Sequence, residues 1–82
     1  MSYEKVKKAK KTIIGTKQAV KAMCTGHVTE IFVALNADDR ITTHAVHLAQ
    51  KNGIPIVFVD SKKELGRACG IQVGAAVVAI TE

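Results

Sequence analysis

The stretch Thr29-Glu30-Ile31-Phe32-Val33-Ala34-Leu35 ends in five consecutive apolar residues. A near-continuous apolar run of this length is typical of a strand that is buried on both faces of its sheet, because a strand with one wet face alternates between apolar and polar residues. The stretch therefore predicts a buried strand, with helices on both sides of the sheet.

The residues that follow this strand have the pattern of an amphipathic helix. Residues 36–39 form a loop that contains helix-capping side chains, and residues 40–51 follow with apolar positions at helical spacing. Asn52-Gly53 is the stop signal. The apolar side of this predicted helix consists of Ile41, Ala45, Leu48 and Ala49.

A second buried strand is predicted over residues 54–59, which are again mostly apolar. Pro55 lies near its start and has no backbone N–H to donate, so that end of the strand should lie at an edge of the sheet. Asp60 or Ser61 then caps a short helix that continues to Ala68.

The same alternation extends to both ends of the chain. We expect a basic helix over residues 3–11, a short β-branched strand over 12–14, a helix over 17–25 that closes at Gly26, and a last strand over 74–80. Strands that alternate with helices in this way indicate an α/β fold with helices on both faces of one sheet.

Composition limits the architecture and the kinds of site. A chain of 82 residues forms one domain, here residues 1–82. Apolar residues make up 48% of it but aromatic residues only 4%, so the core is aliphatic and an aromatic platform for stacking bases is not expected. Two cysteines far apart, Cys24 and Cys69, do not indicate a disulfide scaffold.

The N-terminal stretch is charged, and the longest apolar run, residues 73–80, is too short to span a bilayer. We therefore expect a cytoplasmic protein with reduced thiols, either free or associated with ribosomes. Seven of the lysines fall within residues 1–21, where Glu4 is the only acid. This local basic patch favours nucleic acid as a partner, and not a membrane, because residues 3–11 lack the bulky apolar face that membrane binding needs.

The start of the helix over 17–25 is the most informative part of the patch. Thr16 after Gly15 is read as the N-cap, and the first turn then contains a lysine where the helix dipole favours a carboxylate. Lys17 and Lys21 are four residues apart and share a face with Gln18, which suits phosphates and base edges. A solvated lysine face remains the alternative. The opposite, core side of this helix consists of Val20, Met23 and Cys24.

A second motif is Leu65-Gly66-Arg67-Ala68-Cys69-Gly70-Ile71-Gln72-Val73-Gly74, a glycine-punctuated turn that ends in apolar residues we expect to be exposed. The glycines recur every four residues, form neither GxGxxG nor a Walker loop, and are expected to serve turn geometry and close packing. A nucleotide site elsewhere on the α/β sheet stays an alternative.

Catalytic and metal chemistry have little support in the sequence. His44 and His47 lie three residues apart on one helix, but a third metal ligand would have to be Cys24, Cys69 or Asp38, and no spacing motif supports that set. Cys69 could be a nucleophile, yet no histidine is tied to it in sequence. We predict no enzyme, no metal and no cofactor.

These motifs together resemble the L7Ae family of ribosomal proteins, the kink-turn RNA-binding proteins, in particular its small bacterial members. The resemblance covers essentially the whole chain. It rests on Ile13-Ile14-Gly15-Thr16 before a helix with Lys21, on the acidic turn Asp38-Asp39, and on Lys63-Glu64-Leu65-Gly66-Arg67-Ala68-Cys69-Gly70-Ile71-Gln72-Val73 before residues 74–80. It implies a three-layer α/β/α sandwich around a four-stranded mixed sheet.

The resemblance also implies roles for residues. Gly15, Thr16 and Lys21 match the family motif, whereas Lys17 and Gln18 stand where the family has Asn and Glu. In the family these side chains meet the guanines of tandem G·A pairs. Lysine can donate to guanine O6 and N7, and glutamine can donate and accept, so the chemistry survives in altered form.

The second motif would hold a base that is flipped out of a three-nucleotide bulge. Ile71 and Val73, on either side of Gln72, would pack against this base, and Arg67 would add a phosphate contact. The resemblance thus implies a monomeric, non-enzymatic binder of kink-turns in ribosomal or messenger RNA. The alternatives are a regulatory domain that binds a small molecule or nucleotide and, third, a protein–protein interaction module.

Overall fold

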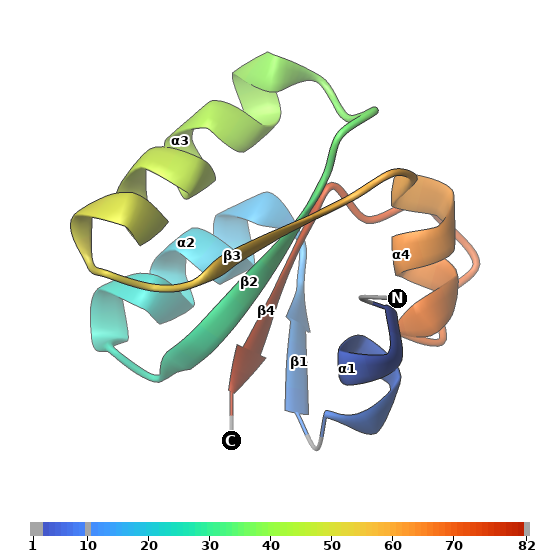
Figure 1. Cartoon of the computed structure of the whole chain (residues 1–82), viewed down its shortest axis with the longest axis horizontal. Helices are drawn as coiled ribbons and strands as arrows, with labels where there is room; N and C mark the ends of the chain where they lie inside the picture. The colour runs from blue at the N-terminus through green and yellow to red at the C-terminus, as the bar shows by residue number, and fades with distance from the viewer. Residues whose placement is uncertain (1–2, 10, 82) are drawn as a thin grey trace.

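The computed structural model describes residues 3–9 and 11–81 and shows helices on both faces of a single sheet (Figure 1). The elements in chain order are α1 (Tyr3–Lys8), β1 (Lys11–Ile14), α2 (Thr16–Thr25), β2 (Val28–Ala34), α3 (Asp39–Lys51), β3 (Ile56–Val59), α4 (Lys62–Ala68) and β4 (Val77–Thr81). The predicted α/β class and three-layer arrangement are therefore confirmed.

The sheet is mixed, with the strand order β1-β4-β2-β3. β2 and β3 are parallel, with Ile31 opposite Ile56, and are connected by α3. β4 enters between β1 and β2 and is antiparallel to both, so that Ala79 lies opposite Ile13 on one side and Ile31 on the other. β3 forms an edge of the sheet, as Pro55 at its start predicts.

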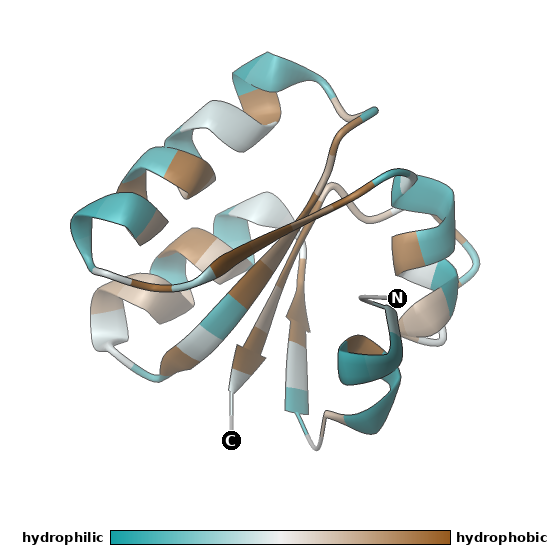
Figure 2. Cartoon of the chain, viewed as in Figure 1, coloured by the Kyte–Doolittle hydropathy of each residue, from teal (hydrophilic) through white to brown (hydrophobic). Residues whose placement is uncertain are grey.

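The central strands consist mostly of apolar residues (Figure 2). Alternate residues of these strands contribute to two separate apolar clusters, one on each face of the sheet. Ile31 and Val33 of β2 pack beneath α2 and α3, together with Ala19 and Met23 of α2. The residues between them point to the other face, where α1 and α4 contribute buried side chains. That second cluster, which we call the α1/α4 cluster, consists of Val6, Phe32, Ala34, Val59, Leu65, Ala75 and Val78.

Three predicted element boundaries need correction. The helix predicted over residues 3–11 ends at Lys8, and Lys11 already pairs with Thr81 in β1; residue 10 lies outside the described residues. The strand predicted over 54–59 begins at Ile56. The last strand begins at Val77 and not at residue 74, because the preceding backbone bonds to α4: the Ala75 N–H donates to the Lys62 carbonyl at 2.9 Å.

Four residues predicted to be buried are exposed. Leu35 lies beyond the end of β2 and is 64% exposed, and Phe58 lies on the edge strand β3 and is 50% exposed.

The other two are helix residues. α2 packs on the sheet through Ala19 and Met23, which are four residues apart, so Cys24 lies outside that stripe. Val20 is half-buried at its border. α3 packs through Thr42, Ala45 and Ala49, and Ile41 therefore falls beside the stripe with 48% of its surface exposed.

One end of the sheet gathers the loops that contain the predicted site. The C-terminal ends of β1, β2 and β3 meet there with the beginning of β4, at the upper end of the sheet in Figure 1. We call this the loop end. The Gly15 N–H donates to the Val77 carbonyl at 3.0 Å, and the Ala34 N–H donates to the Ala76 carbonyl at 2.9 Å, so the first and last strands are joined to β2 at this point.

Candidate functional site

α2 begins directly after β1 with a sharp change in backbone direction. Gly15 is its N-cap and has φ 107° and ψ 145°, a conformation that residues with a side chain rarely adopt. The predicted cap, Thr16, is instead the first residue of the helix, and among the described residues no side-chain hydrogen bond caps the first turn. The prediction of a Thr16 cap is wrong because the glycine turn already brings Thr16 into the helix.

The first turn of α2 is cationic, as predicted. It contains Lys17 and no acidic residue, and Lys17, Gln18 and Lys21 are all exposed. The Gln18 side chain folds back toward Gly15: a Cβ at that glycine would lie 2.8 Å from the Gln18 Oε1. Backbone N–H groups, two ammonium groups and one amide therefore share one surface, which can bind phosphates and the edges of bases.

The turn between α4 and β4, residues 69–76, is the exposed turn of this site, and we call it the Val73 turn. Its conformation depends on two glycines. A Cβ at Gly66 would lie 2.0 Å from the Val73 carbonyl oxygen, so only glycine allows the turn to lie against α4. Gly70 has φ +82°, and after it the chain returns to α4 through an Ile71 N–H bond to the Gly66 carbonyl at 3.1 Å. The glycines thus serve turn geometry and close approach.

The turn exposes only part of what the sequence predicts. Val73 is 69% exposed and Gln72 is exposed, which leaves an apolar and a polar side chain in solvent. Ile71 is half-buried and packs on the α1/α4 cluster, so the expectation that it is exposed is only partly met. An exposed valine that no neighbour covers can contact an apolar or planar partner.

The structure brings the first turn of α2 and the exposed turn to the same end of the sheet. Gly15 bonds to Val77, only three residues beyond Gly74, and α2 follows Gly15 directly. Arg67 lies on α4, which covers the other face of the sheet, and its guanidinium is 3.7 Å from the Glu64 carboxylate. Within residues 3–9 and 11–81, Arg67 is therefore the one predicted site residue that is paired with an acid.

Two residues at the loop end were not predicted as site residues. The Asn36 Oδ1 accepts a hydrogen bond from the Lys62 N–H at 2.8 Å, and a Cβ at Gly74 would lie 3.1 Å from the Lys62 Cγ. The exposed side chains of Asn36 and Lys62 thus border the Val73 turn. The sequence predicts only a loop at Asn36 and only a helix start at Lys62, because nothing in their spacing shows that the two residues meet.

The acidic turn before α3 is a helix cap. The Asp38 carboxylate accepts from the Arg40 N–H at 2.9 Å and from the Arg40 guanidinium at 3.0 Å. The hydrogen bonds from the Arg40 side chain, and secondarily from its backbone, lower the pKa of Asp38 below its usual value. This carboxylate is therefore ionised at neutral pH and engaged within its own turn.

The residues weighed for metal or thiol chemistry do not converge. Across residues 3–9 and 11–81, no group of three or more His, Cys, Asp or Glu side chains is placed to hold a metal ion. His44, His47 and Cys24 are exposed. Burial raises the pKa of the Cys69 thiol, whereas a nucleophilic cysteine needs a lowered pKa.

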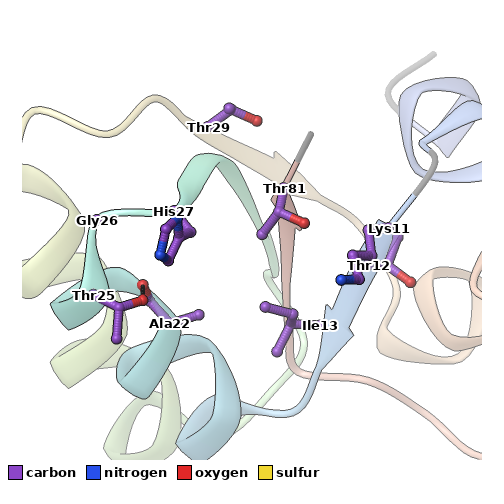
Figure 3. Close-up of a pocket in the computed structure, with 9 residues that line it drawn as sticks. All are labelled: Lys11, Thr12, Ile13, Ala22, Thr25, Gly26, His27, Thr29 and Thr81. Carbon is purple, nitrogen blue, oxygen red and sulfur yellow. Dashed lines mark hydrogen bonds between the residues drawn. The ribbon is translucent and has the colours of Figure 1, made fainter.

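A groove of about 680 Å³ lies at the end of the sheet opposite the loop end (Figure 3). It contains none of the nine predicted residues and is lined by Lys11, Thr12, Ile13, Ala22, Thr25, Gly26, His27, Thr29 and Thr81. The Thr81 hydroxyl is buried and has no hydrogen-bond partner among the described residues. Among the described residues, 3–9 and 11–81, none of the helices has the length and apolarity needed to cross a membrane.

Comparisons with known proteins give matches over nearly the whole chain. A protein-family model described as the ribosomal protein L7Ae/L30e/S12e/Gadd45 family matches residues 2–82. The chain is 56% identical to an RNA-binding protein of Bacillus pumilus and 51% identical to RNA-binding protein YbxF of Geobacillus stearothermophilus, over 98% of each chain.

A solved structure, the Giardia lamblia 15.5kD RNA binding protein, has a TM-score of 0.88 and 30% identity. The match covers 98% of this chain and 70% of that one. These relatives are described as ribosomal and RNA-binding proteins and not as enzymes, which confirms the prediction that the chain is not an enzyme.

Proposed function

The chain belongs to the ribosomal protein L7Ae/L30e/S12e/Gadd45 family, and on that premise we propose that it binds structured RNA at a kink-turn. The target would contain tandem G·A pairs next to a three-nucleotide bulge, in ribosomal or messenger RNA. One observation carries the proposal: an uncapped cationic helix start and an exposed apolar turn lie at the same end of the sheet.

The α2 surface attracts the phosphate backbone and recognises the edges of bases. Lys17 and Lys21 neutralise phosphates, which provides most of the affinity and makes it dependent on salt. Gln18 is neutral, so it contributes only through directed hydrogen bonds to base edges, and these distinguish G·A pairs from other pairs. Lysine and glutamine replace the Asn and Glu of the family motif and use donors suited to guanine O6 and N7.

The Val73 turn supplies the apolar contact. A base that leaves its stack in the bulge exposes a planar apolar face, and the Val73 side chain is open to receive it. Gln72, exposed beside Val73, can reach the polar edge of the same base. The protein would act as a cytoplasmic monomer on one RNA bend, with no cofactor.

A second candidate is a regulatory domain that binds a small molecule, and the groove beside His27 favours it. The two functions differ in what accompanies the purified protein. An RNA-binding protein co-purifies with nucleic acid and shows a raised ratio of absorbance at 260 and 280 nm, which nuclease treatment removes. A small-molecule binder shows no such nuclease-sensitive absorbance.

A gel-shift titration with two RNA stems tests the kink-turn proposal. One stem contains the tandem G·A pairs and the bulge, and its control has the same bulge with those pairs changed to Watson–Crick pairs. Losing two base-reading contacts costs about 2–6 kcal/mol, so we expect the control to bind at least about 30-fold more weakly. Equal affinity for the two stems would leave only a basic patch and contradict the proposal.

A further inference from the structure

Tyr3 links the start of α1 to the junction between β3 and α4. Its ring packs against the α1/α4 cluster, and its hydroxyl donates a short hydrogen bond to the Asp60 Oδ1. The same hydroxyl oxygen accepts from the Ser61 N–H at 3.3 Å. One phenol thus holds two consecutive residues of the junction, although it lies 57 residues away in sequence from the first of them.

The hydroxyl remains a donor over the physiological pH range. Burial of the ring and the hydrogen bond to Asp60 raise the pKa of Tyr3 above its ordinary value of 10.0. A hydrogen bond between a hydroxyl and a carboxylate is also stronger than one between neutral groups. The bond between the Tyr3 hydroxyl and Asp60 can therefore hold the junction between β3 and α4 in place.

The junction between β3 and α4 also fixes the position of the turn that contains Val73. Ser61 caps α4 by accepting from the Glu64 N–H at 3.3 Å, and Lys62 follows directly. The Lys62 N–H donates to the Asn36 Oδ1 at 2.8 Å, and the Lys62 carbonyl accepts from the Ala75 N–H at 2.9 Å. The backbone of Lys62 thus joins the loop after β2 to the segment before β4.

α4 also sets where the exposed side chain stands. Gly66 lies against the Val73 carbonyl so closely that no Cβ would fit between them. A shift of the first turns of α4 must therefore move the Val73 turn with it. The RNA contact depends on the exact position of the Val73 side chain, because displacements of about 1 Å weaken a preorganised site.

We propose that Tyr3 is a positioning residue for the RNA-binding turn: by holding Asp60 and Ser61 it fixes α4, and α4 fixes the turn that contains Val73 and Ala75. The proposal rests on the proposed RNA-binding function. It assigns to α1 a role beyond its lysines and places that role in a single hydroxyl group that never touches the RNA.

Tyr3→Phe is the test, because it removes the hydroxyl and keeps the ring. We expect the affinity for the G·A stem to fall about three- to tenfold, the size of one hydrogen bond, with the salt dependence unchanged since no phosphate contact is lost. In the free protein, amide hydrogen exchange at Lys62 and Ala75 should become several-fold faster. Asp60→Asn keeps an acceptor for the hydroxyl and should keep most of the affinity.

Thr29→Val is the matched control. It removes a hydroxyl that donates to the Ile80 carbonyl at 3.0 Å from the end of the sheet opposite the loop end, so its RNA affinity should equal that of the unaltered protein. Asp60→Ala should lower affinity like Tyr3→Phe, and the double variant should be no weaker than either, because both remove the same bond.

Two results would overturn the proposal. One is unchanged exchange at Lys62 and Ala75 in Tyr3→Phe, measured without RNA. The other is a lowered melting temperature with full affinity per folded molecule, which would make the bond merely structural. If the unaltered protein fails to distinguish the two stems, the proposed function fails instead, and the exchange measurement still decides whether Tyr3 holds the turn.

Discussion

α2 and α4 both begin at the loop end, yet they begin in opposite ways. α4 follows Ser61, whose side chain accepts from the Glu64 N–H, and its first turn contains that acidic residue. α2 follows Gly15, has no side-chain cap in the part of the chain that the structure describes, and has Lys17 but no acid in its first turn. α4 thus has a side-chain cap and a carboxylate at its start, although Lys62 and Lys63 come before that carboxylate, whereas α2 has neither.

The difference indicates where a ligand completes the structure. A carboxylate in the first turn stabilises a helix by about 0.3–1 kcal/mol, and a capping side chain adds roughly a few tenths of a kcal/mol over a glycine cap. α2 has neither. Phosphate oxygens can supply the missing negative charge and accept from the free N–H groups. α4 has no such need, and its first turn instead bonds to Asn36 and Ala75, the neighbours of the exposed turn.

The largest expected effect breaks the α4 side of this comparison. Gly66→Ala places a methyl group 2.0 Å from the Val73 carbonyl oxygen, so the turn must move. We expect a loss of about 3 kcal/mol in the free energy of unfolding, at the upper end of overpacking costs, measured by urea denaturation. In an exposed helix the same change is stabilising, by up to about 1 kcal/mol.

Gly74→Ala is the control in the same turn. Its new Cβ meets the flexible Lys62 side chain at 3.1 Å, which can move aside. Its stability should therefore change by less than about 0.5 kcal/mol, as for most surface substitutions. Equal losses for the two variants would mean that the turn does not depend on close contact with α4.

The next effect separates apolar contact from charge. Val73→Ser changes a side chain that is 69% exposed in the free protein, so the melting temperature should hardly change. Affinity for the G·A stem should fall about tenfold, because burying a valine side chain against the RNA contributes about 1.5 kcal/mol or more to binding. Lys21→Ala should instead make the slope of log affinity against log salt shallower by about one unit. Ile71→Ser should lower the melting temperature as well as the RNA affinity, because Ile71 is half-buried against the α1/α4 cluster.

A smaller effect sharpens the comparison by exchanging the charges. Lys17→Glu places an acid in the first turn of α2 and should raise the free energy of unfolding by about 0.3–1 kcal/mol at low salt, while it weakens RNA binding. Glu64→Lys should lower stability by a similar amount, measured by the same denaturation. A loss of stability in Lys17→Glu would show that the unfavourable start of α2 is not electrostatic.

The smallest effect concerns the thiols. Cys24 is exposed, whereas burial raises the pKa of Cys69, so the Cys69 thiolate forms only at a higher pH than usual. Iodoacetamide at pH 8 should therefore modify Cys24 first, and the rate at Cys69 should keep rising as the pH increases further. Mass spectrometry gives the order of modification. RNA binding should survive Cys24 modification and treatment with a chelator, and loss of binding in either case would contradict our view of these residues.

The order of elements could be predicted from the sequence because apolar periodicity reports directly on burial. The run at residues 31–34 lies fully buried in β2, and Ser61 caps α4 as its residue type suggests. The beginning of the last strand could not be predicted, since residues 74–76 are apolar enough for a strand and only their bond to Lys62 excludes them.

The candidate site was predictable in part. Lys17, Gln18 and Val73 are exposed as the pattern indicates. The α2 cap was misassigned because Gly15 and Thr16 are both acceptable caps by residue type, and the backbone angles decide between them. Asn36 and Lys62 could not be found, because their meeting depends on tertiary contacts between segments far apart in sequence.

The position of β4 between β1 and β2 has a consequence for the order of folding. β2, α3 and β3 form a parallel unit from neighbouring segments and can assemble early, whereas β1 joins the sheet through β4, which brings Lys11 opposite Thr81. Pulse-labelled hydrogen exchange during refolding should show β2 and β3 protected before β1. α2 packs on β2 and α3 through Ala19 and Met23, but its first residue follows Gly15, whose N–H bonds to Val77 at the start of β4. Because β4 is the last strand to be synthesised, we expect the start of α2 to take its final position only when the C-terminal strand joins the sheet.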